Sequence, residues 1–501
     1  MNKKIIYVAI FTSLIFTGCD EFLTEEPQQS IIADQFPVDE EGVRALMNGV
    51  RGRFQEDDMG GSNFILIPDI MSDHIQWTGS FTSYRNLARF QHTPTNAEVT
   101  SMWNNGYEVI NNANLVLQAI DELELTDVDE LRGEALFFRG VLHFELVRWF
   151  GAAYNDGDPS TNPGVPIMLE PVTNLDELVL PSRSSVQAVY DQAAADLLEA
   201  INLLPPTRID ISAAEAPAYP GQNAARGYLM RLRMQQQDYD EAAQLAADII
   251  STGTYSLNGE VSTYFTVEFS GESIYEVSHT VLDAIGVNSC LPCIYYTGAA
   301  RDDANYTPSF FTDVATQVVT ASQHATVNAT GDTIIDTRVR DLIEGNGTGN
   351  NPFKYTDDIN FSDNAPTLRY AEIILSRAEA LARTTGLTQE AVDLLNEIRS
   401  RALRVQDKAT GNTLSNAPAL YSLADFANAN ELIDAILVER AMELAAEGQR
   451  LHDIKRLEIG PFTTGAGGTA SWDDDILVFP IPQSEIDANG NIGPQNPGYG
   501  G

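Results

Sequence analysis

Basic residues are scarce in this chain. Its 501 residues include 30 Lys and Arg against 71 Asp and Glu, which gives a formal net charge of −41 at pH 7. Nucleic-acid binding is driven by Lys and Arg that neutralise phosphates, so this composition argues against a nucleic-acid partner. It also disfavours polyanionic ligands. Hydrophobic residues make up 43% of the chain, which is enough for a large packed core, so the acidity does not indicate disorder.

Long apolar runs are also missing, except for one at the N-terminus. There, two lysines precede an uncharged run from Ile5 to Phe16, which ends at Gly18-Cys19. A basic start, about twelve apolar residues and a small residue before the cleavage site are typical of a secretory signal peptide. Such a run is too short to cross a bilayer core, which needs roughly 20 residues. The cysteine after the glycine resembles a bacterial lipobox, with Phe16 where such motifs usually carry Leu.

These features predict that residues 1–18 are a lipoprotein signal peptide and that Cys19 is lipidated. Residues 19–35 are acidic and polar, and we expect them to form a tether. Acidic residues directly after the cysteine resemble the surface-export signal of Bacteroidetes lipoproteins. The resemblance implies a protein anchored in the outer membrane and facing the cell exterior. Residues 36–501 are expected to form a single domain.

Cysteine is rare, and beyond Cys19 only Cys290 and Cys293 remain, in a C-x-x-C motif. Outside the cytoplasm, a pair this close favours a disulfide. A thioredoxin-like redox pair needs the motif at a helix N-terminus, whereas its flanks look strand-like and loop-like. A zinc site needs two further Cys or His residues nearby, and a nucleobase deaminase needs proline where Ser289 stands. We therefore expect a structural disulfide and no metal site.

Common catalytic motifs are missing as well: the chain has no H-E-x-x-H, no G-x-S-x-G and no P-loop. Glu439, Glu443 and Glu447 recur every four residues and so share one helix face, and paired carboxylates are what glycoside hydrolysis needs. Carboxylates arranged in this way are usually solvated or paired with nearby bases, here Arg440, Arg450 or Lys455. We expect a structural role for them, and neither an enzyme nor a cofactor.

Helical periodicity dominates what is present. Apolar residues recur at spacings of three and four over residues 98–120 and 129–150. A helix rich in small residues that starts near Ala224, a polar turn, and the pattern Tyr239-x-x-Ala242-x-x-x-Ala246 resemble a tetratricopeptide helix pair. The remaining predicted helices cover residues 184–203, 222–236, 239–252, 366–384, 388–404 and 429–447.

Residues 255–365 differ in character, being rich in Thr, Ser, Gly, Asn and Asp. Short β-branched runs at 261–269, 274–279 and 315–320 predict small strands between loops. The sequence therefore predicts a mainly α fold. A tetratricopeptide-like scaffold of helical hairpins, over about 36–254 and 366–501, carries one long irregular insertion with short strands.

The C-terminal third contains a series of short motifs at characteristic spacings. They are Arg369-Tyr370-Ala371-Glu372, Glu439-Arg440, Glu447-Gly448-x-Arg450, Phe479-Pro480-Ile481-Pro482 and Gln495-Asn496-Pro497-Gly498-Tyr499. This series resembles the SusD/RagB family of Bacteroidetes outer-membrane nutrient-binding lipoproteins, and Trp103, Tyr107, Ile110 and Asn114 fit its N-terminal half. The resemblance implies a lid on a SusC-like, TonB-dependent β-barrel that captures oligosaccharides for import. Some family members capture peptides instead, and a surface glycosidase is the least favoured alternative.

Sugar binding has its own requirements: flat aromatic rings for the apolar face of a pyranose, and planar hydrogen-bonding groups for its hydroxyls. Trp103 and Trp149 lie on apolar helix stripes and are expected in the core. The loop 73–85 holds aromatic and polar groups, and the disulfide turn precedes two tyrosines. We expect the loop 73–85 and the irregular insertion to gather on one side as the ligand surface. The candidate ligand-binding residues are Asp73, His74, Trp77, Tyr84, Arg85, Tyr295 and Tyr296.

Overall fold

The architecture comes from a computed structural model. It describes residues 37, 39–173, 180–206, 208, 215–296, 298–299, 301–315, 317–318, 333–342, 350–406, 410, 413–416 and 420–499. The predicted signal peptide, the lipidation site Cys19 and the whole predicted tether lie outside the described residues.

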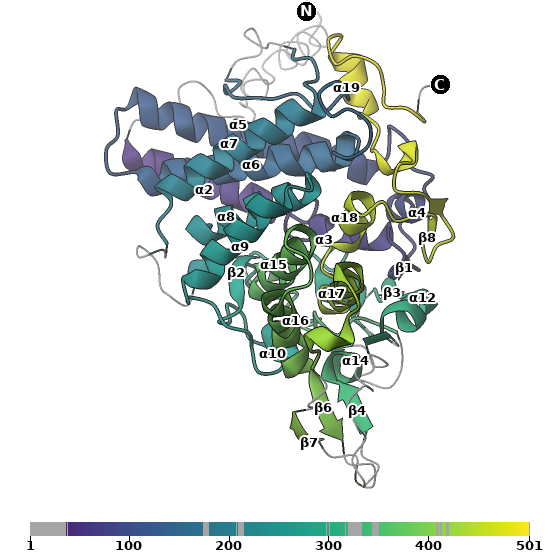
Figure 1. The fold of residues 1–501 in the computed structure, drawn as a ribbon. Helices are drawn as coiled ribbons and strands as arrows, with labels where there is room; N and C mark the ends of the chain where they lie inside the picture. Colours follow the sequence, from purple (N-terminus) through teal and green to yellow (C-terminus); the bar gives the residue numbers. More distant parts are fainter. Residues whose placement is uncertain are drawn as a thin grey trace, which may run out of the picture.

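Long helices form the scaffold and pack largely in chain order (Figure 1). From α2 to α9 they follow one another, and α9 then packs against α15, which also contacts α16 and α17. This arrangement confirms the predicted mainly α, tetratricopeptide-like fold. The long helices are α2 (Glu40–Gln55), α5 (Ala97–Glu122), α6 (Asp129–Phe150), α7 (Val186–Leu203), α8 (Gln222–Gln235), α9 (Tyr239–Ser251), α15 (Tyr370–Thr384), α16 (Gln389–Ala402) and α17 (Ala429–Glu443).

Capping side chains fix where many of these helices begin. In each case an Asn, Ser, Asp or Thr side chain accepts hydrogen bonds from backbone N–H groups of the first turn, which otherwise lack a partner. The caps of α5, α7, α9, α16 and α17 are Asn96, Ser185, Asp238, Thr388 and Asn428. The predicted helix starts are correct to within two residues at these five positions.

Aromatic side chains fill the space between the helices. Trp103 and Trp149 are 2% and 1% exposed, which confirms that both belong to the core. Gly227 of α8 has a packing role, because a Cβ at this position would lie 2.1 Å from Cδ2 of Leu368. A glycine here lets the strand that carries Leu368 approach the helix closely.

Short strands pair only in small antiparallel sheets within the described residues: β1 with β3, β2 with β5, β6 between β4 and β7, and β8 with β9. Their bounds are β1 (Ile75–Trp77), β2 (Ser273–Val277), β3 (Ala304–Tyr306), β4 (Thr333–Asp336), β5 (Ala365–Arg369), β6 (Leu403–Gln406), β7 (Thr413–Asn416), β8 (Phe462–Thr463) and β9 (Thr469–Ala470). The shorter helices are α3 (Asn63–Ile70), α4 (Thr82–Ala88), α10 (Val261–Thr266), α11 (Leu291–Tyr295), α12 (Pro308–Phe310), α14 (Thr337–Leu342), α18 (Arg450–Arg456), α19 (Gln483–Ala488), the 3-10 helices η4 (Ala216–Ala218), η6 (Leu423–Asp425) and η7 (Asp475–Leu477), and the π-helix η5 (Phe311–Ala315).

The insertion is more helical than the sequence predicts. The run at 261–269 begins with a helix, α10, instead of the predicted strand. Val261 and Tyr264 are three residues apart, so a helix places both on one face, and both are buried. The run at 274–279 does form a strand, β2. The predicted strand at 315–320 is not found in its described residues: η5 ends at 315, residues 317–318 are helical, and the rest lie outside the described residues.

Two predicted helix boundaries differ from the observed ones because of strand pairing. Residues 365–369 form β5 against β2, so the helix predicted from 366 starts at Tyr370. The helix predicted over 388–404 ends at Ala402, where β6 begins. The helix predicted over 429–447 ends at Glu443. Backbone pairing with a distant segment replaces helical hydrogen bonds in the first two cases.

The three glutamates Glu439, Glu443 and Glu447 are buried rather than solvated, at 1%, 0% and 5% exposure. They belong to a buried ion network that also contains two further carboxylates and five bases. We call these residues the glutamate network: Glu272, Asp336, Glu439, Glu443 and Glu447 with Arg338, Lys354, Arg369, Arg399 and Arg401. Five acids face five bases, so the charges balance.

Bases from distant segments hold this network together. Arg369 reaches Glu443 and Glu447 at 2.7 Å each, and Lys354 reaches Glu447 at 2.5 Å. Although burial alone would raise it, the arginines Arg401, Arg369 and Arg338 hold the pKa of Glu443 well below its usual range. The expected partners were wrong: Arg440 pairs with Asp453, Arg450 pairs with Asp73, and Lys455 donates to the backbone carbonyl of Arg148.

Candidate functional site

Strand pairing brings the two predicted ligand loops together. Strand β1 follows the start of the loop 73–85, and β3 follows the disulfide turn; the two pair antiparallel, with Trp77 opposite Ala304. Past the strand, the backbone N–H of Thr78 donates to the carbonyl of Asp303 at 2.8 Å. The loop 73–85 and the segment around the disulfide therefore form one continuous surface.

Trp77 does not face that surface. Its side chain is 5% exposed, and its ring centroid lies 5.0 Å from that of Tyr84, which is 6% exposed. The hydroxyl of Tyr84 donates to Oδ1 of Asn63 at 2.8 Å. A Cβ at Gly79 would lie 2.5 Å from the Trp77 ring, so the chain folds tightly over it. The expectation that Trp77 and Tyr84 stack on a ligand is wrong for this structure, because β1 and α4 bury both rings.

Tyr295 is likewise buried, at 0% exposure. Its hydroxyl donates to Oδ2 of Asp69 at 2.8 Å, and burial raises the pKa of Asp69 to about 7. Tyr295 therefore anchors helix α11 rather than presenting a ring, and the expectation for it is also wrong. Tyr296, one residue later, is half-buried and packs edge-on against Phe353 with centroids 5.1 Å apart.

Asp73 is held by a protein partner, and the His74 side chain is buried. Arg450 makes two 2.8 Å contacts to the Asp73 carboxylate. Although burial alone would raise it, the hydrogen bonds from Arg450 hold the pKa of Asp73 at about 2. His74 is 5% exposed, and burial lowers its pKa to about 3. Neither side chain is placed to bind a ligand directly.

Different side chains occupy the joint surface. Phe81 is half-buried, and the guanidinium of Arg301 lies 4.0 Å above its ring centroid. Arg301 also pairs with Asp303 at 2.8 Å, and Arg85 donates to the carbonyl of Ser80 at 2.5 Å. We call the exposed and half-buried residues at this junction the Phe81 patch: Ser80, Phe81, Arg85, Asn288 and Arg301. Of the predicted residues, only Arg85 belongs to it.

The disulfide turn supports this patch. Cys290 and Cys293 are joined, with their Cα atoms 5.2 Å apart. The flanks are helical rather than strand-like: Cys290 caps α11, and its Sγ accepts from the N–H of Cys293. The carbonyl of Cys293 accepts from the N–H groups of both Arg301 and Asp302. The cross-linked turn therefore holds the backbone that carries the Arg301 guanidinium.

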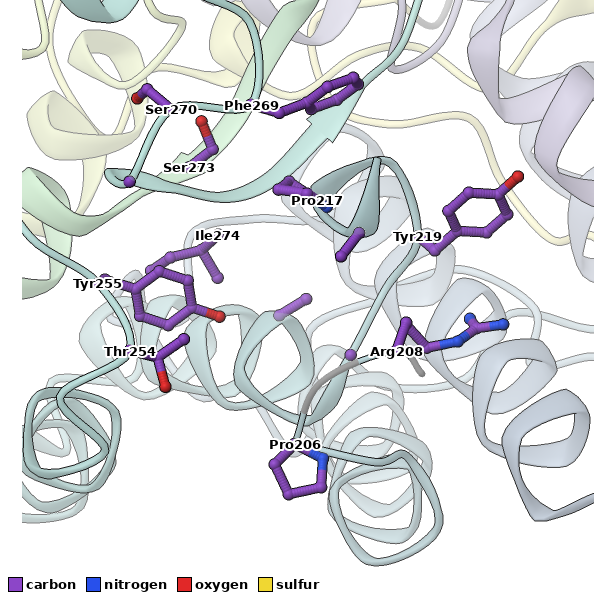
Figure 2. Close-up of a pocket in the computed structure, with 14 residues that line it drawn as sticks. Pro206, Arg208, Pro217, Tyr219, Thr254, Tyr255, Phe269, Ser270, Ser273 and Ile274 are labelled. Carbon is purple, nitrogen blue, oxygen red and sulfur yellow. The ribbon is translucent and has the colours of Figure 1, made fainter. Parts of the chain in front are cut away.

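A hollow outside these two loops is partly lined by the irregular insertion that was predicted for the ligand surface, with Tyr255, Phe269 and Thr280, but none of its lining residues was predicted individually. One cavity of about 220 Å³ is shown in Figure 2, where Tyr255 and Tyr219 stand at opposite ends and Phe269 lies along one edge. An adjoining cavity of about 520 Å³ reaches α2 and the end of β2. Tyr219 and Phe269 line both cavities, so the two form one groove, which we call the Tyr219 groove.

Comparison with known proteins identifies the family. Residues 21–234 match the model of a family described as "Starch-binding associating with outer membrane", and residues 338–499 match the model of the SusD family. These matches define a class of helical proteins related to a family that is described as starch-binding and associated with the outer membrane. The chain belongs to the SusD/RagB family of Bacteroidetes.

Relatives cover nearly the whole chain. SusD-like protein P2 of Formosa agariphila is 24% identical over 99% of both chains, and SusD-like protein P38 of the same organism is 22% identical over 91% of both. A SusD superfamily structure from Bacteroides fragilis gives a TM-score of 0.74 at 22% identity, covering 92% of this chain and 100% of that one. A structure from Bacteroides vulgatus described as a candidate sugar binding protein gives 0.72 at 26% identity, covering 92% and 98%.

Proposed function

We propose that this protein captures oligosaccharides at the cell surface and binds them at the Phe81 patch. It then serves as the lid of a SusC-like, TonB-dependent outer-membrane barrel. The observation that carries the proposal is the junction of the loop 73–85 with the disulfide segment, which presents a half-buried ring among planar polar groups.

The chemistry of the patch suits a sugar. A pyranose offers an apolar face to a flat ring and a rim of hydroxyls to planar donors and acceptors. Phe81 supplies the ring, while Arg85, Arg301 and Asn288 supply guanidinium and amide groups around it. Asp303 neutralises Arg301, and Arg85 then supplies one positive charge to the patch, which is less than the cluster of bases that favours a sulfated or uronate glycan.

The relatives support the same ligand class. One family model names starch binding and outer-membrane association, and one structural neighbour is described as a candidate sugar binding protein. Lipidation at Cys19 fixes the protein to the membrane, facing outward. A surface binder without a transporter has no route to deliver its ligand, which is why the proposal includes a barrel. Within the described chain, no helix combines the length and apolarity needed to cross a membrane.

We also propose that the protein is a binder and not an enzyme. The carboxylates that resemble a hydrolytic pair, Glu439 and Glu443, are both paired with arginines and almost fully buried. A general acid needs a carboxyl whose pKa is raised toward neutrality, but the pKa of Glu443 is lowered. These side chains stabilise the fold.

The test is affinity electrophoresis of the mature protein through gels that contain one soluble polysaccharide each: amylopectin, laminarin, xylan or mannan. We expect at least one neutral glycan to retard the wild type. Phe81→Ala should weaken that binding about tenfold, because a stacked ring is worth about 0.5–1.5 kcal/mol beyond the area it buries. Phe81→Leu, which keeps the apolar bulk without the ring, is the matched control for folding and should also bind weakly. Binding of a casein-derived peptide mixture, with no glycan bound, would overturn the proposal.

A further inference from the structure

The Tyr219 groove has the size and lining of a ligand site. Its larger cavity, about 520 Å³, falls within the usual range of roughly 300–1,000 Å³ for small-ligand pockets. None of its lining residues belongs to the Phe81 patch. It is built from the outer face of α2, from the segment of η4, and from both ends of β2.

Two guanidinium groups hold the Tyr219 ring in place. Arg51 lies 4.9 Å and Arg208 lies 5.3 Å from the ring centroid. Both arginines donate to the same carboxylate, Glu134, which is fully buried: Arg51 at 2.5 and 2.6 Å, and Arg208 at 3.3 Å. The ring is half-buried, so part of it remains open to the groove. A pre-oriented ring loses little conformational entropy when a ligand stacks on it.

The groove is lined by both aromatic and polar groups. Phe269 and Tyr255 are half-buried and supply two further rings at its edges (Figure 2). Amides and hydroxyls face the larger cavity from two sides, since α2 contributes Asn48 and Gln55, and the end of β2 contributes Ser278 and Thr280. Planar amides and hydroxyls beside flat rings are the groups that bind a sugar.

The charges of the groove select among glycans. Glu134 offsets one of the two positive charges of Arg51 and Arg208. Three further carboxylates, Glu215, Glu268 and Asp283, line the larger cavity and are exposed to solvent. The local balance is therefore negative, which repels sulfate and uronate groups.

We propose that the Tyr219 groove is a second binding site, for a neutral oligosaccharide. It lies apart from the Phe81 patch and rests on the proposed glycan-binding function. A chain with two such sites holds a long polysaccharide by two contacts, so its avidity exceeds the affinity of either site.

The experiment is calorimetric titration with an oligosaccharide of six or seven sugars, cut from whichever neutral polysaccharide retards the wild type. We expect two sites per chain in the wild type. Tyr219→Ala should weaken one of them at least about tenfold, and combining it with Phe269→Ala should leave one site, while Tyr219→Phe should keep both. Tyr421→Ala is the matched control, because Tyr421 is another half-buried tyrosine with a guanidinium, that of Arg399, 4.4 Å from its ring. It should keep both sites.

The outcomes separate this inference from the proposed function. A single site that is lost in Phe81→Ala and unchanged in Tyr219→Ala overturns the groove but leaves the proposed function standing. A single site that is lost in Tyr219→Ala and unchanged in Phe81→Ala supports the groove and removes the Phe81 patch from the proposed function. Competition at the groove by a sulfated or uronate oligosaccharide overturns the ligand class. Binding of peptides alone overturns both proposals.

Discussion

The guanidinium of Arg301 lies 4.0 Å above the ring of Phe81, and the two residues come from segments far apart in the sequence. The pairing of β1 with β3 makes this contact possible, since it joins the loop 73–85 to the segment that follows the disulfide turn. Residues that flank the junction on its inner side, such as Trp77 and Tyr295, are buried. The proposed ligand surface is therefore made by the outward side chains of these loops, while the inward aromatic residues hold the loops in place.

Trp77 is expected to stabilise the fold rather than bind a ligand. Removing a buried aromatic ring leaves a cavity, so Trp77→Ala should lower the free energy of unfolding by about 3–5 kcal/mol. Trp77→Phe should lose much less. Glycan affinity, measured by titration at a temperature where both variants remain folded, should change far less than in Phe81→Ala. An unchanged melting temperature combined with lost glycan binding would show that the ring faces the ligand after all.

The helices could be predicted from sequence because their signals are local. Apolar spacing and capping side chains such as Asn96 and Asp238 lie within the segment that they shape. Strand β5 could not be predicted in this way, because only its pairing with β2 removes residues 365–369 from the helix that follows. The burial of Glu443 depends on arginines more than 40 positions away, which no local pattern reveals.

The candidate site was predicted in outline but not in its side chains. Both loops were correctly chosen as neighbours on one surface, yet an aromatic residue in a Gly- and Ser-rich loop gives no sign of which way it points. Gln76 and Trp77 are neighbours on β1, so their side chains point to opposite faces of the strand. Trp77 lies on the buried face. Tyr219 was missed because its segment has no periodic pattern, and its partners Arg51 and Arg208 come from elsewhere in the chain.

Acid should destabilise the protein through Asp73. Its pKa is lowered from 3.8 to about 2 in the folded state, so its contribution is present above about pH 4 and is lost as the pH falls toward 2. This lowering corresponds to about 2 kcal/mol. Asp73→Asn should therefore cost about that much at pH 7 and progressively less below pH 4, in urea unfolding at a series of pH values. Asp473→Asn, at an exposed carboxylate, serves as the control and should change little at any pH. A constant deficit for Asp73→Asn from pH 7 to pH 2 would contradict the role of this ion pair.

The disulfide is expected to form in the mature exported protein. Alkylation without reductant should add no mass at Cys290 or Cys293, and alkylation after reduction should add two labels. Because the closed loop is short, the chain-entropy model assigns the bond only about 2 kcal/mol. The double variant Cys290→Ser/Cys293→Ser should therefore stay folded, but bind glycan more weakly at the Phe81 patch, since the turn holds the backbone of Arg301. Two free thiols in the native protein would refute the bond.

Membrane attachment is expected to depend on Cys19. Cys19→Ala should move the protein from the membrane fraction to the soluble fraction without changing its melting temperature. Protease added to intact cells should digest the wild type and spare a periplasmic control. Purification of the tagged wild type from solubilised membranes should bring down a TonB-dependent barrel. Repeated purification without such a barrel would exclude the lid mechanism while leaving glycan binding intact.

Gly79 is expected to affect both the stability of the fold and glycan binding at the Phe81 patch. A Cβ at this position would lie 2.5 Å from both the Trp77 ring and the Asp303 carboxyl carbon, and Asp303 is the partner of Arg301. Gly79→Ala should therefore push these groups apart and cost about 1–3 kcal/mol of stability, the usual range for overpacking.

Gly259→Ala is the matched control for this substitution, since nothing lies within 4 Å of its Cβ position. Loss of a glycine where the backbone conformation suits other residues is neutral or slightly stabilising. We expect Gly79→Ala to melt lower and to bind glycan more weakly than the wild type, because the displaced Asp303 no longer holds Arg301 over Phe81. Equal melting temperatures and affinities for the two glycine variants would show that the joint between β1 and β3 is looser than these distances indicate, and that the Arg301–Phe81 pair is not held by Asp303.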